Sequence, residues 1–166
     1  MPDVASTPVS LVAEQFKVTT NLYLKALGGV SREQLLKRPG ERSNPLLWIA
    51  GHLALSRIRV ANVLGGAREQ PGWSELFATG SKVEDVTRFP DVAEVIALWR
   101  ELADEVQQRL RALPPERLEE PVQVRIPSDD GTLRGALALI AFHEAYHVGQ
   151  MGYVRKWLGL SPLVDG

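Results

Sequence analysis

The sequence contains no cysteine among its 166 residues. This absence excludes disulfide bonds, thiolate metal ligands and a cysteine nucleophile, and it does not fit a disulfide-stapled secreted domain. The first ten residues, MPDVASTPVS, also lack the basic stretch and the following apolar stretch of a secretion signal. We therefore expect a cytoplasmic location.

An excess of charge of either sign is missing too, since 19 basic residues face 20 acidic ones. Proteins that depend on phosphate contacts usually carry a basic excess, so we expect no nucleic-acid partner. No apolar run reaches the roughly 18 residues of a membrane-spanning helix, so we expect no membrane partner. The length is typical of one domain that folds without a covalent staple, and we expect a single domain over residues 1–166.

Four long segments have the apolar periodicity of amphipathic helices. They cover approximately residues 9–27, 45–64, 92–113 and 133–158, and glycine or proline residues follow each of them. A long connection over residues 65–90 contains WSELF, which we expect to form one helical turn. Four amphipathic helices with almost no strand pattern predict an all-α four-helix bundle.

Short motifs predict where these helices begin. The expected N-caps are Thr7, Ser31, Asn44 and Asp91. Ser31 and Asp91 are each followed three residues later by Gln34 or Glu94, the pattern of a capping box. Proline at the next position supports Thr7 and Asn44 as caps. The alternating stretch PVQVRIP, residues 121–127, is the only segment with an extended pattern.

The chain has three histidines, and all lie within predicted long helices: His52, His143 and His147. His143 and His147 are four residues apart, which places them on one helix face about 6 Å apart along the axis. Their neighbours on that face and around His52 are largely apolar, so the imidazoles are expected to point inward. Burying three imidazoles without partners is costly, and a shared cation removes that cost.

These histidines therefore predict one divalent metal ion. Three neutral imidazoles leave coordination positions open, which is typical of catalytic rather than structural sites. Zinc, nickel, iron and manganese all accept such ligands, and ligand type alone does not choose among them.

Residues 143–147, HEAYH, also match the H-E-x-x-H motif of zinc proteases. Such a protease requires a third ligand, either a downstream glutamate or an H-x-x-G-x-x-H continuation. After His147 the only carboxylate side chain is Asp165, and the continuation fails because Gln150 and Tyr153 occupy the required positions. We therefore reject the protease interpretation and expect Glu144 to be a partly solvated residue.

The second and fourth helices resemble the DinB/YfiT-like family of metalloenzymes. The resemblance is carried by WIAGHL at residues 48–53 and HEAYHVGQMGYVRKWLG at residues 143–159. The family pattern has one histidine on the second helix and H-x-x-x-H followed by G-Q on the fourth. His52, His143, His147 and Gly149-Gln150 fill these positions.

This resemblance implies a divalent ion held by the three histidines, often in a homodimer. It also implies a small-molecule substrate, since some relatives are transferases or isomerases that use a low-molecular-weight thiol such as bacillithiol or mycothiol. We expect a metal-dependent enzyme of the thiol-dependent transferase or hydrolase type. A metal-binding module without catalysis and a structural bundle with hydrogen-bonded histidines remain alternatives.

Several other residues have two interpretations from the sequence. Gln150 and Tyr146 are candidates for orienting a substrate or a metal-bound water, or they make ordinary polar contacts. Glycines inside the helices, including Gly51, either leave room for a substrate or allow close packing. Arg155 is expected to form a surface salt bridge, and Trp157 is expected in the core with Trp48 and Trp99.

Overall fold

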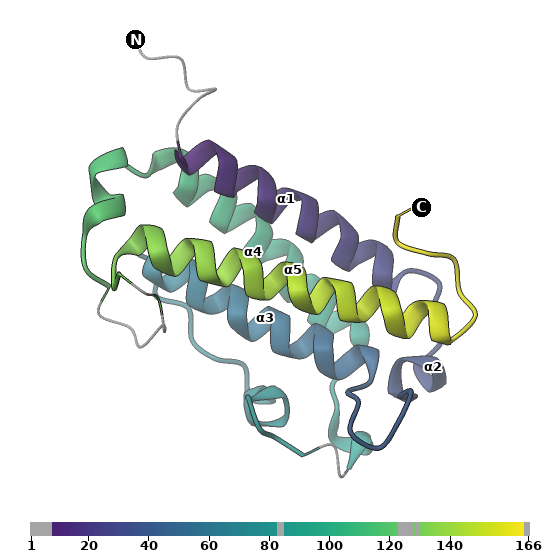
Figure 1. The fold of residues 1–166 in the computed structure, drawn as a ribbon. Helices are drawn as coiled ribbons and strands as arrows, with labels where there is room; N and C mark the ends of the chain where they lie inside the picture. Colours follow the sequence, from purple (N-terminus) through teal and green to yellow (C-terminus); the bar gives the residue numbers. More distant parts are fainter. Residues whose placement is uncertain (1–7, 83–84, 123–127, 129, 165–166) are drawn as a thin grey trace.

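The computed structural model describes residues 8–82, 85–122, 128 and 130–164. Four long helices form the bundle (Figure 1): α1 (Pro8–Leu27), α3 (Leu46–Val63), α4 (Val92–Ala112) and α5 (Leu133–Trp157). The shorter elements are α2 (Arg32–Leu36) and the 3-10 turns η2 (Ser74–Phe77), η3 (Val86–Arg88) and η4 (Pro115–Glu119). The predicted all-α four-helix bundle is confirmed.

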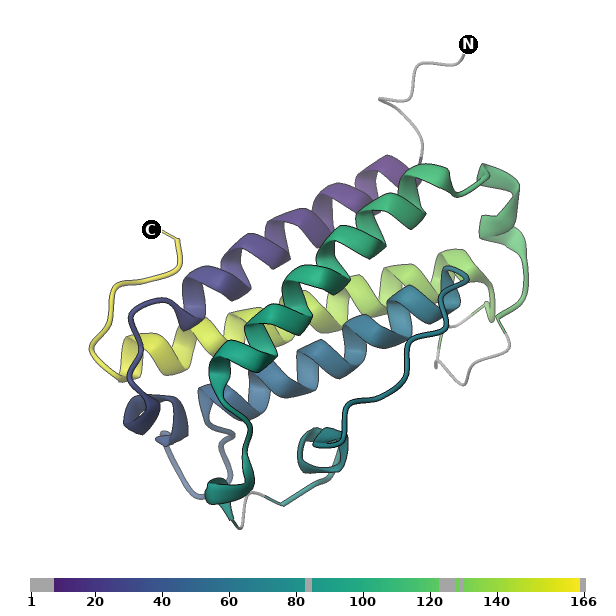
Figure 2. The ribbon, with the colours of Figure 1, turned by 180° about the vertical axis from the view of Figure 1, so that it is seen from behind.

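The four helices form a closed ring of contacts in which α1 and α3 each pack against both α4 and α5. Followed from N- to C-terminus, α1 and α5 run in one direction and α3 and α4 in the other (Figure 1, Figure 2). Because α3 and α4 are parallel neighbours, the connection between them must return along the bundle. This connection carries η2, which packs against α3.

Two of the four predicted N-caps, Ser31 and Asp91, agree with the structure. Ser31 and Gln34 form the expected capping box, and the Asp91 carboxylate accepts from the Ala93 N–H. Glu94 does not complete a second box, because its carboxylate accepts from the Trp73 indole at 2.6 Å.

Other expectations about the connections have mixed outcomes. The prediction for Asn44 is wrong, since Pro45 is the N-cap residue of α3 and no side chain caps that end. The expected helical turn in WSELF is confirmed as η2. Thr7 and residues 123–127, most of the stretch expected to be extended, lie outside the described residues.

The core contains large aromatic side chains that join the helices. Tyr23 on α1 stacks on Trp99 on α4 with 3.9 Å between ring centroids. Trp48 and Trp99 are buried as expected, whereas the prediction for Trp157 is wrong because it is 46% exposed near the end of α5.

Within the described ranges, no helix combines the length and apolar character needed to cross a membrane.

Candidate metal centre

The three histidines of the chain meet between α3 and α5. Nε2 of His143 lies 3.2 Å from Nε2 of His52 and 3.1 Å from Nε2 of His147. His52 comes from α3, and the other two occupy successive turns of α5. The antiparallel packing of these helices thus brings together side chains that are 91 residues apart in the sequence.

Hydrogen bonds at Nδ1 fix the orientation of two of these rings. Nδ1 of His52 lies 2.9 Å from the carbonyl oxygen of Phe77 on η2. A carbonyl only accepts, so this Nδ1 carries the proton and Nε2 presents a lone pair. Nδ1 of His147 lies 2.7 Å from Oε1 of Gln150, whose amide nitrogen donates to the Tyr146 hydroxyl. In neutral His147, Nδ1 therefore carries the proton, and the unprotonated Nε2 points at His143.

The third ring, His143, has a hydrogen-bond partner that can act as donor or acceptor. Its Nδ1 lies 3.5 Å from Oγ of Ser56, a hydroxyl that can donate or accept. If the hydroxyl accepts, Nδ1 of His143 carries the proton. Nε2 of His143 then has a lone pair and faces the unprotonated Nε2 atoms of His52 and His147. If the hydroxyl donates, Nε2 carries the proton and can satisfy only one of its two imidazole neighbours at a time.

Gly51 allows the Phe77 carbonyl to reach His52. A Cβ at Gly51 would lie 2.5 Å from Cγ of the buried Phe77 ring, so any side chain there would displace η2. The glycine therefore serves close packing between α3 and η2. Gly149 differs, because nothing lies within 4 Å of the position its Cβ would take.

The surroundings favour neutral imidazoles. Burial lowers the pKa of His143 to about 4, assisted by the neighbouring histidines and by the Arg59 guanidinium. Burial likewise lowers the pKa of His52 and His147, although the hydrogen bonds that they donate to Phe77 and Gln150 partly oppose the effect. Neutral imidazole is the form that binds a metal ion.

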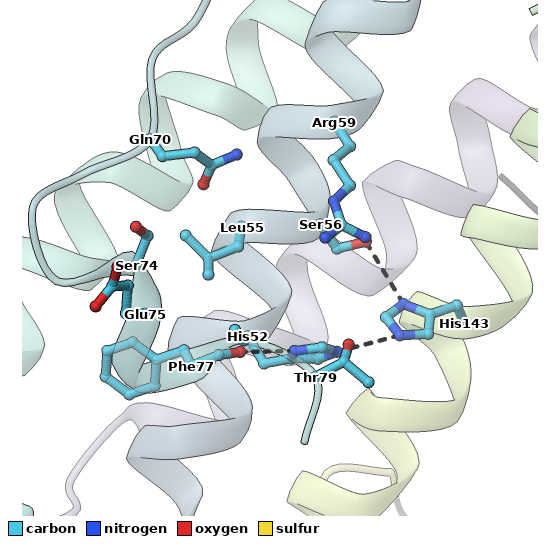
Figure 3. Close-up of a pocket in the computed structure, with 11 residues that line it drawn as sticks. His52, Leu55, Ser56, Arg59, Gln70, Ser74, Glu75, Phe77, Thr79 and His143 are labelled. Carbon is cyan, nitrogen blue, oxygen red and sulfur yellow. Dashed lines mark hydrogen bonds between the residues drawn. The ribbon is translucent and has the colours of Figure 1, made fainter. Parts of the chain in front are cut away.

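A cleft of about 280 Å³ lies beside His52 and His143. Figure 3 shows its walls, formed by α3, the η2 region and α5. This volume is at the small end of the range for ligand pockets and suits a small molecule. Its charged lining residues are Arg59 on α3 and Glu75 on η2.

Glu144 belongs to a different environment from its neighbour His143. Its side chain and that of Arg57 are both 0% exposed. Arg57 donates from Nε to Oε2 at 2.8 Å and from Nη2 to Oε1, and the Thr19 hydroxyl also donates to Oε1. The expectation of a partly solvated Glu144 is wrong, because α1 and α3 cover this face of α5.

Arg155 is also buried, contrary to the expected surface salt bridge. Its guanidinium donates to the carbonyls of Ala26 and Gly28 at the end of α1, and to the Ser161 carbonyl. These bonds attach the chain after α5 to the end of α1. Arg155 therefore has a structural role away from the histidines.

Three further residues surround the centre and were not among the predicted site residues. Ser56 and Arg59 follow His52 by four and seven residues, so helical spacing could have placed both on its face. Phe77 contributes a main-chain carbonyl from a connection, which leaves no signal in the sequence. Gln150, a candidate for orienting a substrate or a water, accepts a hydrogen bond from the His147 ring.

Comparisons with known proteins agree with this architecture. A solved structure described as "YfiT from Bacillus subtilis is a probable metal-dependent hydrolase with an unusual four-helix bundle topology" superposes with a TM-score of 0.66 at 19% identity. The match covers 92% of this chain and 89% of that one. No curated protein matches the sequence significantly. The sequence model of the DinB superfamily matches residues 15–151, and the chain belongs to this superfamily.

Proposed function

We propose that this chain is a metal-dependent enzyme that holds one divalent ion through Nε2 of His52, His143 and His147. The observation that carries the proposal is the convergence of these three nitrogens, which lie within 4.8 Å of one another. Nitrogens about 2.0–2.1 Å from one ion are separated by roughly 2.9 Å at right angles and 3.4 Å at tetrahedral angles. The two close separations, 3.1 and 3.2 Å, lie between these values.

The groups behind the rings support the same proposal. Histidine ligands usually donate their second N–H to a carbonyl, an amide or a carboxylate, which fixes the ring orientation. Phe77 and Gln150 provide such acceptors for His52 and His147. In the proposed site Ser56 accepts from His143, which leaves all three Nε2 lone pairs available.

A bound divalent ion with open positions would lower the pKa of a water or a thiol and so supply a nucleophile at neutral pH. The chain contributes three neutral imidazoles, the hydrogen bonds that orient them, and a cleft that admits a small substrate beside them. The reaction class we propose is hydrolysis or transfer to a low-molecular-weight thiol. Zinc, nickel, iron and manganese remain candidates, because the two close separations, 3.1 and 3.2 Å, lie between the values for octahedral and tetrahedral angles and imidazole ligands suit all four metals.

A structural bundle without metal requires a different proton arrangement. Nε2–H of His143 would be shared between His52 and His147, and Ser56 would donate to Nδ1 of His143. The single N–H of His143 can bond only one of these two imidazoles at a time. The Nε2 lone pair of the other would then have no hydrogen-bond donor among the histidines. A bound cation satisfies all three lone pairs, which is why we favour the metal site.

Metal analysis tests the proposal. Protein purified without chelator, stripped and then titrated with zinc or nickel should take up about one ion per chain. The His52→Ala, His143→Ala and His147→Ala variants should each lose tight binding. Absence of divalent-ion uptake by the wild-type protein overturns the proposal. Turnover assays with electrophiles and a thiol then separate an enzyme from a metal-binding module.

We also propose a homodimer formed through the outer face of α5. Between residues 138 and 153 the exposed residues of this helix are all uncharged: Ala138, Phe142, Ala145, Tyr146, Gly149 and Tyr153. Phe142 and Tyr153 are 68% and 65% exposed, and a contiguous apolar face of this kind is typical of an interface. Light scattering should give the mass of two chains, reduced to one by Phe142→Glu. A monomeric wild-type protein contradicts the proposal.

A further inference from the structure

We infer that Arg59 makes the cleft an anion-recognition site, so that the ligand of this centre is a small molecule carrying an oxyanion group. The oxyanion would bind Arg59 while the reacting group of the ligand approaches the three histidines. This inference rests on the proposed function and adds the chemical class of the ligand.

The position of Arg59 follows from helix geometry. His52, Ser56 and Arg59 are spaced by four and three residues and therefore lie along one face of α3. Figure 3 shows Arg59 extending from α3 on the His143 side of the cleft. Its charge lowers the pKa of both His52 and His143, which agrees with a guanidinium close to the two imidazoles.

The donors of Arg59 are available, unlike those of Arg57 two residues earlier. Arg57 is fully buried and committed to Glu144 and to groups of α1. Arg59 is exposed, and the part of the chain that the structure describes gives it no acidic partner. A planar guanidinium with free donors binds carboxylate, sulfonate or phosphate oxygens through paired hydrogen bonds.

The distribution of charge in the cleft gives the ligand an orientation. Glu75 is the other charged lining residue, and it comes from η2 on the opposite side (Figure 3). The other polar side chains that line the cleft, such as Gln70, Ser74 and Thr79, are neutral. An anionic group is therefore favoured at the end of the cleft near His143 and disfavoured at the Glu75 end.

The test uses the cobalt(II)-loaded protein and four thiols with the same two-carbon stem. Two are anionic (3-mercaptopropionate and 2-mercaptoethanesulfonate), one is neutral (2-mercaptoethanol) and one is cationic (cysteamine). Thiolate binding is followed by its charge-transfer absorption with cobalt. The sulfonate separates recognition by Arg59 from chelation of the ion by a carboxylate, because sulfonate is a poor metal ligand.

Both anionic thiols should bind about tenfold more tightly than 2-mercaptoethanol, the discrimination expected from charge-assisted hydrogen bonds. Arg59→Gln should remove this preference and leave the affinity for 2-mercaptoethanol unchanged. Two controls should keep the preference: Glu75→Gln, which removes the opposite charge in the same cleft, and Arg100→Gln, which removes an exposed arginine of α4.

The possible failures are distinguishable. If the thiols bind but the anionic ones are not preferred, or if Arg59→Gln retains the preference, the inference is overturned and the metal site stands. If the protein takes up no cobalt, zinc or nickel, the proposed function fails and the inference fails with it.

Discussion

His143 and Glu144 are neighbours in the sequence but belong to two polar clusters of opposite character. The histidine cluster, formed by His52, His143 and His147, is partly exposed, and the Nε2 lone pairs of His52 and His147 point at Nε2 of His143. The buried ion pair, formed by Arg57 and Glu144, is completely enclosed and fully hydrogen-bonded.

The comparison separates polar groups that stabilise the fold from polar groups that are the proposed metal ligands. The buried ion pair connects α3, α5 and α1, and its donors and acceptors satisfy one another. The histidine cluster has two Nε2 lone pairs, those of His52 and His147, directed at Nε2 of His143 beside a cleft, an arrangement that the proposed cation would satisfy. One turn of α5 therefore supplies a structural carboxylate and two candidate ligands, although the same residues match a protease motif.

The largest expected effect concerns the stability of the buried ion pair. Glu144→Gln keeps the side-chain shape but leaves the Arg57 charge buried without its counter-ion, which should lower the free energy of unfolding by about 3 kcal/mol or more. Urea unfolding of the metal-free protein measures this loss. Glu101→Gln, which removes an exposed partner of Arg68, should cost less than about 1 kcal/mol. Equal stability of the two variants contradicts the structural role of Glu144.

Removal of a histidine should lower the affinity for the metal more than it lowers the free energy of unfolding. His147→Ala or His52→Ala removes one of three proposed ligands and should weaken zinc affinity at least about a hundredfold. Metal-free His147→Ala, which removes a half-buried side chain, should unfold closer to the wild-type urea concentration than metal-free His52→Ala, which also loses the buried hydrogen bond to Phe77. Calorimetric titration with zinc measures the affinity. If His52→Ala binds zinc as tightly as wild type, α3 contributes no ligand to the site and the proposed three-histidine site is contradicted.

A smaller effect is expected from the group that orients His147. Gln150→Leu removes the acceptor of the Nδ1–H and should weaken zinc affinity by about 10- to 100-fold. Tyr146→Phe removes only a hydroxyl that contacts the Gln150 amide, so it should retain most of the affinity. If the two variants bind zinc equally well, Gln150 does not position the ring.

A further effect is a pH dependence of the metal-free protein. The pKa of His143 is lowered to about 4 in the folded protein, whereas an unfolded histidine titrates near about 6.5. The unfolded chain thus binds more protons between these values. The contribution to stability is complete above about pH 6.5 and is lost as the pH falls toward 4. The urea midpoint of His143→Gln should decrease less steeply with falling pH over this range than that of wild type. Equal decreases in the two proteins would contradict the lowered pKa of His143.

The sequence predicted the helices and the histidine cluster because both depend on local periodicity. His143 and His147 share a face through their spacing, and the inward direction of His52 followed from its apolar neighbours. The environment of Glu144 could not be predicted in the same way. Its burial depends on Arg57 and on the approach of α1, and both are tertiary contacts without a local pattern.

The same reason explains the other differences. The Phe77 carbonyl reaches His52 from a long connection, and Arg155 is buried by the segments that follow α1 and α5. Asn44 has the residue type of a cap, but the helix begins one residue later than expected. A solvated Glu144 carboxylate would leave the stability of Glu144→Gln close to wild type, whereas the buried ion pair predicts a loss.

A crystal structure of the zinc-loaded protein with anomalous diffraction data at the zinc edge tests the central claim most directly. The account predicts one zinc ion about 2.0–2.1 Å from Nε2 of His52, His143 and His147, with the Glu144 carboxylate still bound to Arg57. An ion bound without His52, or one ligated by Glu144, would contradict the account.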